Sequence, residues 1–193
     1  MLKIFFYIKI IFLFSFTYEV LAASSINQAE FSFLYGAGSS SSINRIIGKG
    51  KLIPPVSQFM GVEYRSPTLF YRFPIKLDMQ ILKHFDRQHA FEGVICPVIE
   101  TPKVFLGKVG FNWAVGNGVS GLIGKYTDFE EISSGVKTRR FLNYLLVEQN
   151  MFLKEDPTYQ LTLRWHHRCH VFGTIAPKGT GSNFFVIGIK YLM

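Results

Sequence analysis

The chain has 193 residues, of which 48% are hydrophobic, 16% aromatic and only 18% charged, and its formal net charge is +8. Soluble domains carry about 25% charged residues, so this composition argues against an ordinary soluble protein. No internal stretch reaches the roughly 18 uncharged apolar residues of a membrane-spanning helix, which favours a membrane barrel built from strands.

Residues 1–22 have the features of an export signal. Lys3 precedes an apolar run from Ile4 to Phe16, which only Lys9 interrupts, and Val20-Leu21-Ala22 supplies a small-residue cleavage site. The alternative is an N-terminal membrane anchor, which the short and interrupted run disfavours. We therefore expect residues 23–193 to form one exported domain. A basic exported protein suits anionic lipid head groups, and nucleic acid is not expected as a partner.

Eight later segments alternate between apolar and polar residues, as strands with one apolar face do. These segments are 29–35, 57–65, 68–78, 89–100, 103–115, 139–153, 159–169 and 182–193. The connections at 36–56, 81–88, 116–138 and 170–181 are long or polar, whereas those at 66–67, 101–102 and 154–157 are short turns. Bacterial outer-membrane barrels have an even number of strands, long extracellular loops and short periplasmic turns. The sequence therefore predicts an all-β fold, an eight-stranded antiparallel transmembrane β-barrel with both termini periplasmic.

The segment from Tyr159 to Cys169 shows the alternation most clearly. One face carries Tyr159, Leu161, Leu163, Trp165, His167 and Cys169, and the other carries Gln160, Thr162, Arg164, His166 and Arg168. A membrane barrel turns its apolar face to lipid and its polar face to the lumen. His167 and Cys169 therefore lie on the lipid-facing wall near the outer rim, and Asn183 on the last strand lies at the same height, facing the same way.

The two cysteines, Cys96 and Cys169, would reach an oxidising compartment, where a disulfide is the default. If Phe91, Ile95 and Ile99 face lipid, Cys96 faces inward, and side chains on opposite sides of a barrel wall cannot bridge without backbone distortion. A bulge at Pro97 would reverse that parity, so a disulfide stays an open alternative.

His167 and Cys169 form a candidate nucleophile–base pair, because residues two apart on a strand point the same way. Asn183 could hold the imidazole tautomer, as the asparagine of Cys-His-Asn proteases does. Such spacing is common by chance. The backbone amides of His170 and Gly173 are candidates for stabilising an oxyanion.

The C-terminal third resembles the lipid A 3-O-deacylase (PagL) family of outer-membrane acyl hydrolases. The resemblance rests on His166-His167-Arg168-Cys169-His170-Val171-Phe172-Gly173 and on Gly181 to Tyr191. The family has His-x-Ser near the end of the penultimate strand and an acidic residue on the last strand, which complete a Ser-His-Glu triad on the lipid-facing wall. His167 stands at the family's histidine, Cys169 at its serine and Asn183 approximately at its glutamate, so two of three positions depart from the pattern.

The resemblance implies hydrolysis of a fatty acyl ester of lipopolysaccharide, the 3-O-linked one in this family, in the outer membrane of a Gram-negative bacterium. In this reading Leu163, Trp165 and Phe185 hold the acyl chain. Arg168 is a candidate for contacting lipid phosphates, although solvation in the lumen or in a loop is the favoured alternative for this residue. No cofactor or metal is expected, since zinc-ligand spacing such as His-Glu-x-x-His is absent from the sequence.

Two other functions stay open for this sequence. The missing serine and glutamate favour a catalytically inactive barrel with a structural or adhesion role. A soluble lipid-carrying barrel would need apolar residues inside, which the polar inner faces disfavour. A homodimer is an open alternative to a single barrel.

Overall fold

The computed structural model describes residues 28–39, 57–68, 75–86, 88–125, 129–130 and 137–193. The expected export signal, residues 1–22, lies outside them. Within these ranges the chain is built almost entirely from strands. They are β1 (Glu30–Ser39), β2 (Ser57–Arg65), β3 (Ile75–Asp86), β4 (His89–Glu100), β5 (Val104–Leu106), β6 (Val109–Lys125), β7 (Phe141–Leu153), β8 (Tyr159–Cys169) and β9 (Gly181–Leu192). A 3-10 turn, η1 (Val171–Gly173), follows β8.

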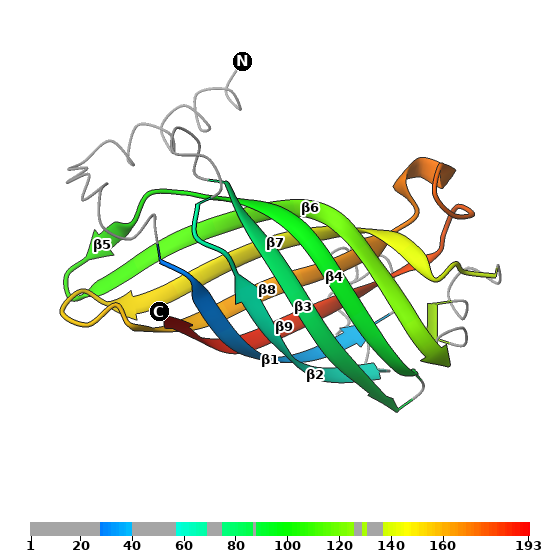
Figure 1. The fold of residues 1–193 in the computed structure, drawn as a ribbon, viewed down its shortest axis with the longest axis horizontal. Coiled ribbons are helices and arrows are strands. Elements are labelled where there is room, and N and C mark those ends of the chain that lie inside the picture. Colours follow the sequence, from blue (N-terminus) through cyan, green and yellow to red (C-terminus); the bar gives the residue numbers. More distant parts are fainter. Residues whose placement is uncertain (1–27, 40–56, 69–74, 87, 126–128, 131–136) are drawn as a thin grey trace, which may run out of the picture.

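The strands form one closed antiparallel barrel (Figure 1). The order around the wall is β4-β3-β2-β1-β9-β8-β7-β6, and pairing of β4 with β6 closes the ring. β5 pairs only with β6 and lies outside this ring. The wall therefore has eight strands, which confirms the predicted fold class. Within the described residues no helix is long and apolar enough to cross a membrane.

The predicted boundaries of the fourth and seventh strands, 89–100 and 159–169, agree with β4 and β8. The third predicted strand, 68–78, overlaps β3 at residues 75–78, but its predicted end is wrong, because β3 runs from Ile75 to Asp86. Residues 69–74 lie outside the described part. Residues 81–86 were expected in a polar connection. They continue the strand because His84 and other polar side chains of β3 point into the lumen, where they find partners.

The fifth prediction, 103–115, is also wrong. The chain turns at Gly107, whose φ is +63°, and β6 then runs from Val109 to Lys125 through residues expected in a loop. Gly116 and Gly118 were expected in the connection 116–138. They lie where a Cβ atom would come within 2.6 and 2.2 Å of atoms of β4, so they mark close packing of two strands. Consequently, the expected alternation of long and short connections fails after β2, after β3 and after β4.

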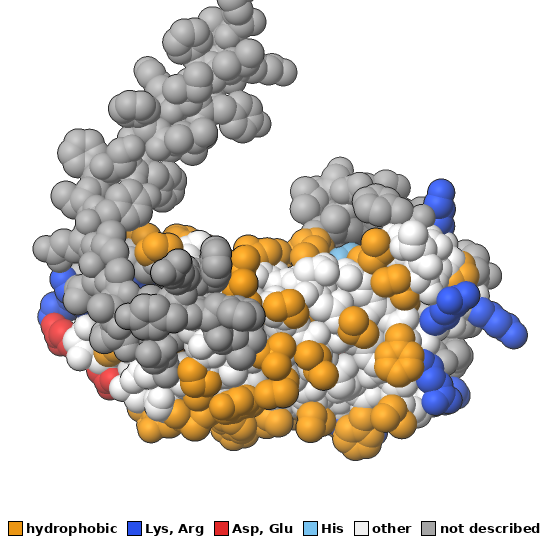
Figure 2. All heavy atoms as spheres, turned by 45° about the horizontal axis from the view of Figure 1, so that its top comes forward, with side chains coloured by type: hydrophobic (Ala, Val, Ile, Leu, Met, Phe, Trp, Pro, Cys, Tyr) orange, Lys and Arg blue, Asp and Glu red, His pale blue; other side chains and the backbone are white. Residues whose placement is uncertain are grey.

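The outer wall of the barrel is apolar. Side chains of successive residues alternate between buried and exposed along β4, β8 and β9. Figure 2 shows hydrophobic side chains spread over the visible wall between two ends that carry charged groups. The most exposed include Phe33, Ile81, Phe91, Ile95, Ile123, Phe141 and Ile189. This pattern matches a wall that contacts lipid.

The interior is filled with charged and aromatic side chains. Arg65 on β2 donates to both carboxylate oxygens of Glu148 on β7, at 3.0 and 3.1 Å, and to Asp78 at 2.9 Å. β2 and β7 stand opposite each other in the ring, so this pair spans the lumen. Arg164 pairs with Glu63 and with Glu148. Of these buried ion pairs, Arg65–Glu148 and Arg164–Glu63 connect strands that share no backbone hydrogen bonds.

Glycines on the inner face make room for aromatic rings. Gly36 faces Phe59 across the β1–β2 pair, and Gly38 faces Phe184 across the β1–β9 pair. A Cβ atom at Gly36 or Gly38 would lie within 2.5 Å of the opposing ring. Phe59 and Phe184, with ring centroids 5.0 Å apart, form the centre of an apolar layer in the outer half of the lumen.

The two ends of the barrel differ. Glu30 pairs with Leu192, so the first and last strands bring the described ends of the chain to the same rim. Cys169, η1 and the connection from β8 to β9 lie at the opposite rim, toward the right of Figure 1. This arrangement agrees with the expectation that the end of the seventh predicted strand lies far from the termini.

Candidate functional site

The predicted site residues lie on the outer face of β8 and β9. His167 and Cys169 follow Tyr159, Leu161 and Leu163 on the exposed side of β8, and each is half-buried. His167 is the direct cross-strand partner of Asn183. The Asn183 side chain is almost fully covered, with 5% of the residue exposed. The structure thus brings these three residues together on the outer wall, at the end of β8 and the start of β9.

The side chains of His167, Asn183 and Trp165 form a hydrogen-bonded group. His167 Nδ1 lies 2.8 Å from Asn183 Oδ1, and Trp165 Nε1 donates to the same oxygen at 3.0 Å. An indole N–H can only donate, so the shared Asn183 atom is an oxygen and not the amide nitrogen. An oxygen acceptor requires a proton on His167 Nδ1, which leaves Nε2 of a neutral imidazole free to accept a proton.

Trp165 also packs on the imidazole. The two rings are stacked with centroids 5.1 Å apart and an interplanar angle of 30°. Trp165 was expected to contact substrate. In the structure it also holds Asn183 by a hydrogen bond and the ring of His167 by stacking. Sequence reasoning missed these contacts because an indole on a lipid-facing strand ordinarily belongs to an interfacial belt.

The Cys169 sulfur has three polar neighbours. The His167 imidazole and the Val171 backbone N–H both reach it as hydrogen-bonding groups. Asn143, the partner of Cys169 on β7, donates through Nδ2 at 3.7 Å. Asn143 was missed by the sequence reasoning. The sequence did contain a sign of its role. Asn143 places an amide between Phe141 and Leu145 on the lipid-facing side of a strand, where a polar side chain is unexpected.

The backbone after Cys169 is strained. Val171 has a φ of +46°, a left-handed conformation that is rare for a β-branched residue. Gly173 N donates to His170 Nδ1 at 2.9 Å and lies 3.2 Å from His170 O. The Gly173 amide is therefore engaged within the turn, contrary to its expected role as an oxyanion donor. The N–H of Val171, by contrast, lies within interaction range of the Cys169 thiol.

The residues expected to hold an acyl chain border a hollow beside the site. Leu163 and Phe185 are exposed on the outer wall, and Trp165 is half-buried next to them. Together with Trp113, Val147 and Gln149 they surround a depression of about 470 Å³ whose floor is the backbone of β7, β8 and β9. Its upper edge at Trp165 lies two residues below His167.

Arg168 requires a correction. It was expected to contact lipid phosphates, but its side chain faces the lumen, where it is fully buried and pairs with Glu130. Arg168 alternates with His167 and Cys169, so a strand that turns those two outward must turn Arg168 inward. The lumen alternative for this residue is the one that the structure shows.

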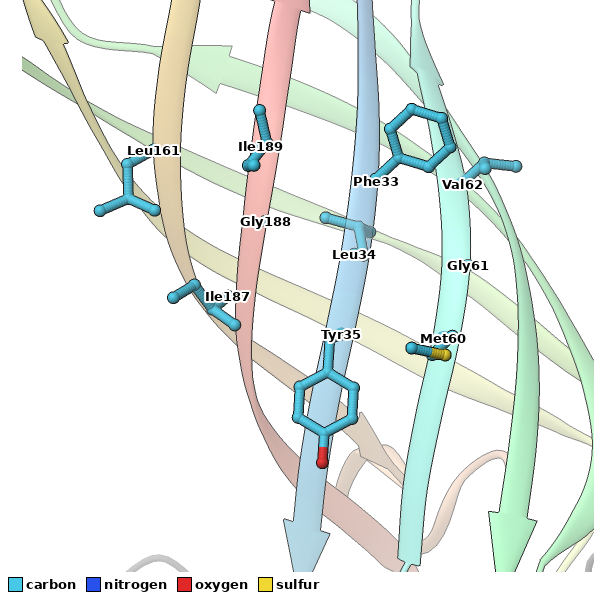
Figure 3. Close-up of a pocket in the computed structure, with 10 residues that line it drawn as sticks. All are labelled: Phe33, Leu34, Tyr35, Met60, Gly61, Val62, Leu161, Ile187, Gly188 and Ile189. Carbon is cyan, nitrogen blue, oxygen red and sulfur yellow. The ribbon is translucent and has the colours of Figure 1, made fainter.

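A second hollow lies on the neighbouring part of the wall (Figure 3). It has a volume of about 600 Å³ and extends over β8, β9, β1 and β2. Phe33, Tyr35, Met60, Ile187 and Ile189 project around it, and the backbone at Gly61 and Gly188 forms part of its floor. The Tyr35 hydroxyl donates to Gln58 at 2.5 Å at the end nearer the site. This wall therefore offers two apolar grooves on either side of β8 and β9.

Both cysteines are free thiols in the structure. Cys96 faces the lumen and is fully buried, whereas Cys169 is half-buried on the outer wall. In the folded barrel we expect one thiol to react with a small membrane-permeable maleimide, and two to react after unfolding in denaturant without reductant. Peptide mass spectrometry should assign the native adduct to Cys169. If no thiol reacts with the maleimide after unfolding, the two cysteines form a disulfide, and the assignment of both as free thiols is wrong.

In the part of the chain that the structure describes, no group of three or more His, Cys, Asp or Glu side chains could hold a metal ion. The three candidate site residues themselves supply a thiol, an imidazole and an amide.

No protein-family model matches the sequence, and no curated protein matches it. Among solved structures, the chain is similar to the outer membrane enzyme PagL, with a TM-score of 0.53 and 9% identity over 84% of this chain and 98% of PagL. It is also similar to Neisserial surface protein A, with a TM-score of 0.46 and 9% identity over 85% of this chain and 95% of that one. Ail, the attachment invasion locus protein of Yersinia pestis, gives a TM-score of 0.41 and 10% identity over 86% and 99% of the two chains. At 9% identity the likeness to PagL concerns architecture, and by architecture this chain is an eight-stranded barrel of the outer-membrane type.

Proposed function

We propose that the chain is an outer-membrane hydrolase that removes a fatty acyl chain from lipopolysaccharide by way of a thioester on Cys169. The observation that carries this proposal is the 2.8 Å hydrogen bond between His167 Nδ1 and Asn183 Oδ1 beside a thiol on the outer wall. A nucleophile, a base and a group that orients the base are the parts that nucleophilic acyl transfer requires.

The surface supports a location in a membrane. The exposed side chains of the wall are apolar, whereas exposed cations gather at the rim that carries the site, toward the right of Figure 2. These cations include Lys125, Lys137, Arg139, Arg140 and Lys178. Basic groups at a membrane surface attract anionic lipid head groups. Together with the expected export signal, these features favour the outer membrane of a Gram-negative bacterium, with lipopolysaccharide as the lipid.

The first chemical step uses the tautomer described above. His167 Nε2 takes the proton from the Cys169 thiol, and Asn183 Oδ1 keeps the ring in place through Nδ1–H. The thiolate attacks the ester carbonyl carbon, and the tetrahedral intermediate collapses with cleavage of the carbon–oxygen bond. The departing sugar alkoxide takes the proton back from His167, which leaves an acyl thioester on Cys169.

Water completes the reaction from the rim side. His167 Nε2 accepts a proton from water, the resulting hydroxide attacks the thioester carbonyl, and the carbon–sulfur bond breaks to release the fatty acid. The thiolate then regains the proton from His167. Negative charge develops on the carbonyl oxygen in both steps, and the Val171 N–H and Asn143 Nδ2 are the donors placed beside the sulfur to stabilise it.

The substrate would lie along the wall and not inside the barrel. The hollow bordered by Leu163, Trp165 and Phe185 runs from just below His167 toward the middle of the wall, so it suits the acyl chain whose ester reaches Cys169. The larger groove around Phe33 and Ile187 would accommodate another chain of the same lipid or of a neighbouring one. Phosphates then meet the cations of the rim.

Asn183→Ala is expected to lower the initial rate of acyl release by about a hundredfold, because the imidazole loses the partner that fixes its tautomer and orientation. Trp165→Phe, which keeps an aromatic ring but removes the indole N–H, should lower the rate by a smaller factor. The measurement is release of hydroxy fatty acid from lipopolysaccharide by the purified barrel in detergent. Asn117→Ala is the matched control, because Asn117 is an exposed amide on the same wall without a place in the site.

The function itself is tested in cells. The chain is expressed in the outer membrane of a Gram-negative host, and lipid A is analysed by mass spectrometry with and without expression. We expect lipid A to lose the mass of one hydroxyacyl chain. Lipid A of unchanged mass, with the barrel shown to be folded in the outer membrane, would reject the hydrolase and favour an inactive structural or adhesion barrel. That second function is favoured by one observation: Asn183 is neutral and supplies no charge to stabilise an imidazolium.

A further inference from the structure

Two described residues between β6 and β7 lie inside the barrel behind the site. These residues, Phe129 and Glu130, are both completely buried. The Phe129 ring lies 5.6 Å from the ring of Phe184 and joins the apolar layer of the lumen. A buried aromatic anchor next to a buried carboxylate fixes the place of that carboxylate.

Glu130 holds the strands of the site together from the lumen side. Its Oε1 accepts from Arg168 Nη1 and from Ser182 Oγ, the latter at 3.0 Å, and its Oε2 accepts from Thr138 at 3.0 Å. Arg168 and Ser182 are direct cross-strand partners on β8 and β9. One carboxylate therefore clamps a residue pair that spans the two strands.

The clamped pair lies between the residues of the candidate site. Arg168 separates His167 from Cys169, and Ser182 immediately precedes Asn183. The wall is one backbone thick, so the positions of Arg168 and Ser182 set those of their neighbours on the outer face. Cys169 is the last residue of β8 and Gly181 the first of β9. Strand ends open more readily than strand centres, so a clamp is most useful at this level.

From this geometry we infer that Glu130 is a positioning residue, which holds Cys169, His167 and Asn183 in register through Arg168 and Ser182. The inference rests on the proposed function for its catalytic consequence, because a displacement of about 1 Å between reacting groups costs about a hundredfold in rate. The structural part of the inference concerns only the arrangement of the Cys169 thiol and the His167 imidazole, and it can be tested without any substrate.

The test measures the rate at which iodoacetamide alkylates Cys169 across a range of pH in the purified, folded barrel, with peptide mass spectrometry separating Cys169 from Cys96. Glu130→Gln keeps the shape of the side chain and removes its charge. Its rate–pH profile is expected to move away from the wild-type profile, and its acyl release should fall by at least about tenfold. Asp78→Asn is the matched control, because Asp78 is a buried acid that pairs with Arg65 and not with β8.

Ser182→Ala provides a second, milder variant that removes one contact of the clamp should Glu130→Gln fail to fold. A profile shift in Glu130→Gln or Ser182→Ala, with Asp78→Asn unchanged, supports the clamp. Wild-type profiles in both clamp variants, or the same shift in Asp78→Asn, would overturn it. If the wild-type barrel releases no fatty acid but the clamp variants still shift the thiol profile, the proposed hydrolase fails and the clamp stands.

Discussion

Replacing Cys169 by alanine is expected to abolish acyl release, with a loss of at least about a thousandfold in rate. Removal of the nucleophile leaves only the acceleration supplied by substrate binding and by oxyanion donors. Lipid A from cells that express Cys169→Ala should have the mass found in cells without the barrel. Cys169→Ser should retain a measurable part of the activity, because the serine hydroxyl can use the same imidazole, although it is the weaker nucleophile.

Cys96→Ala is the matched control for this prediction. Cys96 is the other thiol of the chain, it faces the lumen in an apolar cluster with Val94 and Val98, and it takes no part in the proposed chemistry. The control variant should release fatty acid at the wild-type rate. Equal lipid A masses in cells expressing the wild-type barrel and Cys169→Ala would contradict a nucleophilic role for this thiol.

The largest effect on stability is expected from Arg65→Met. The Arg65 guanidinium is completely buried and pairs with five carboxylates, those of Glu30, Glu63, Asp78, Glu100 and Glu148. Removing one partner of a buried ion pair leaves an uncompensated charge, which costs about 3–5 kcal/mol. The free energy of unfolding, measured by urea titration of the barrel in detergent micelles, should fall by about that amount.

Lys108→Met is the control for the charge change. Lys108 pairs with Glu155 at 3.8 Å, and both side chains are at least 80% exposed. Exposed pairs of this kind contribute little to stability, so the unfolding transition should not move. If Arg65→Met unfolds at the wild-type urea concentration, the buried network does not stabilise the barrel in the way proposed.

The sequence was informative wherever the alternation of side chains was uninterrupted. From Tyr159 to Cys169 every second residue is apolar up to Trp165, and both the bounds of β8 and the outward direction of its last histidine and cysteine followed from that pattern. The inward direction of Cys96 followed from Ile95 and Ile99 in the same way. Parity along a strand is a local property, and the sequence therefore contains it.

The errors have a common physical origin in the lumen. Residues 81–86 were assigned to a loop because His84 and Asp86 are polar, yet His84 is buried against Glu92 of β4 at 2.7 Å. Gly116 and Gly118 of β6 were expected in a connection, yet they allow close contact with β4. In each case the stabilising partner belongs to another strand, and a single sequence does not reveal which strands are neighbours.

The site was predictable in part for the same reason. The shared face of His167 and Cys169 follows from spacing, whereas the contact of Asn183 with Trp165 and the approach of Val171 depend on register and on one unusual backbone angle. Arg168 was assigned to phosphate recognition because of its charge, although its parity already indicated the lumen.

The buried ion pairs that connect opposite strands have one further consequence. Arg65, Glu148, Arg164 and their partners occupy the interior of the described barrel with ion-paired side chains, whereas the candidate site lies on its outer wall. Side chains that face outward and side chains that face the lumen alternate along the same strands. Outward-facing residues can consequently be exchanged while the buried ion pairs stay intact. One barrel of this design can therefore serve equally as an enzyme or as a membrane protein without catalytic activity.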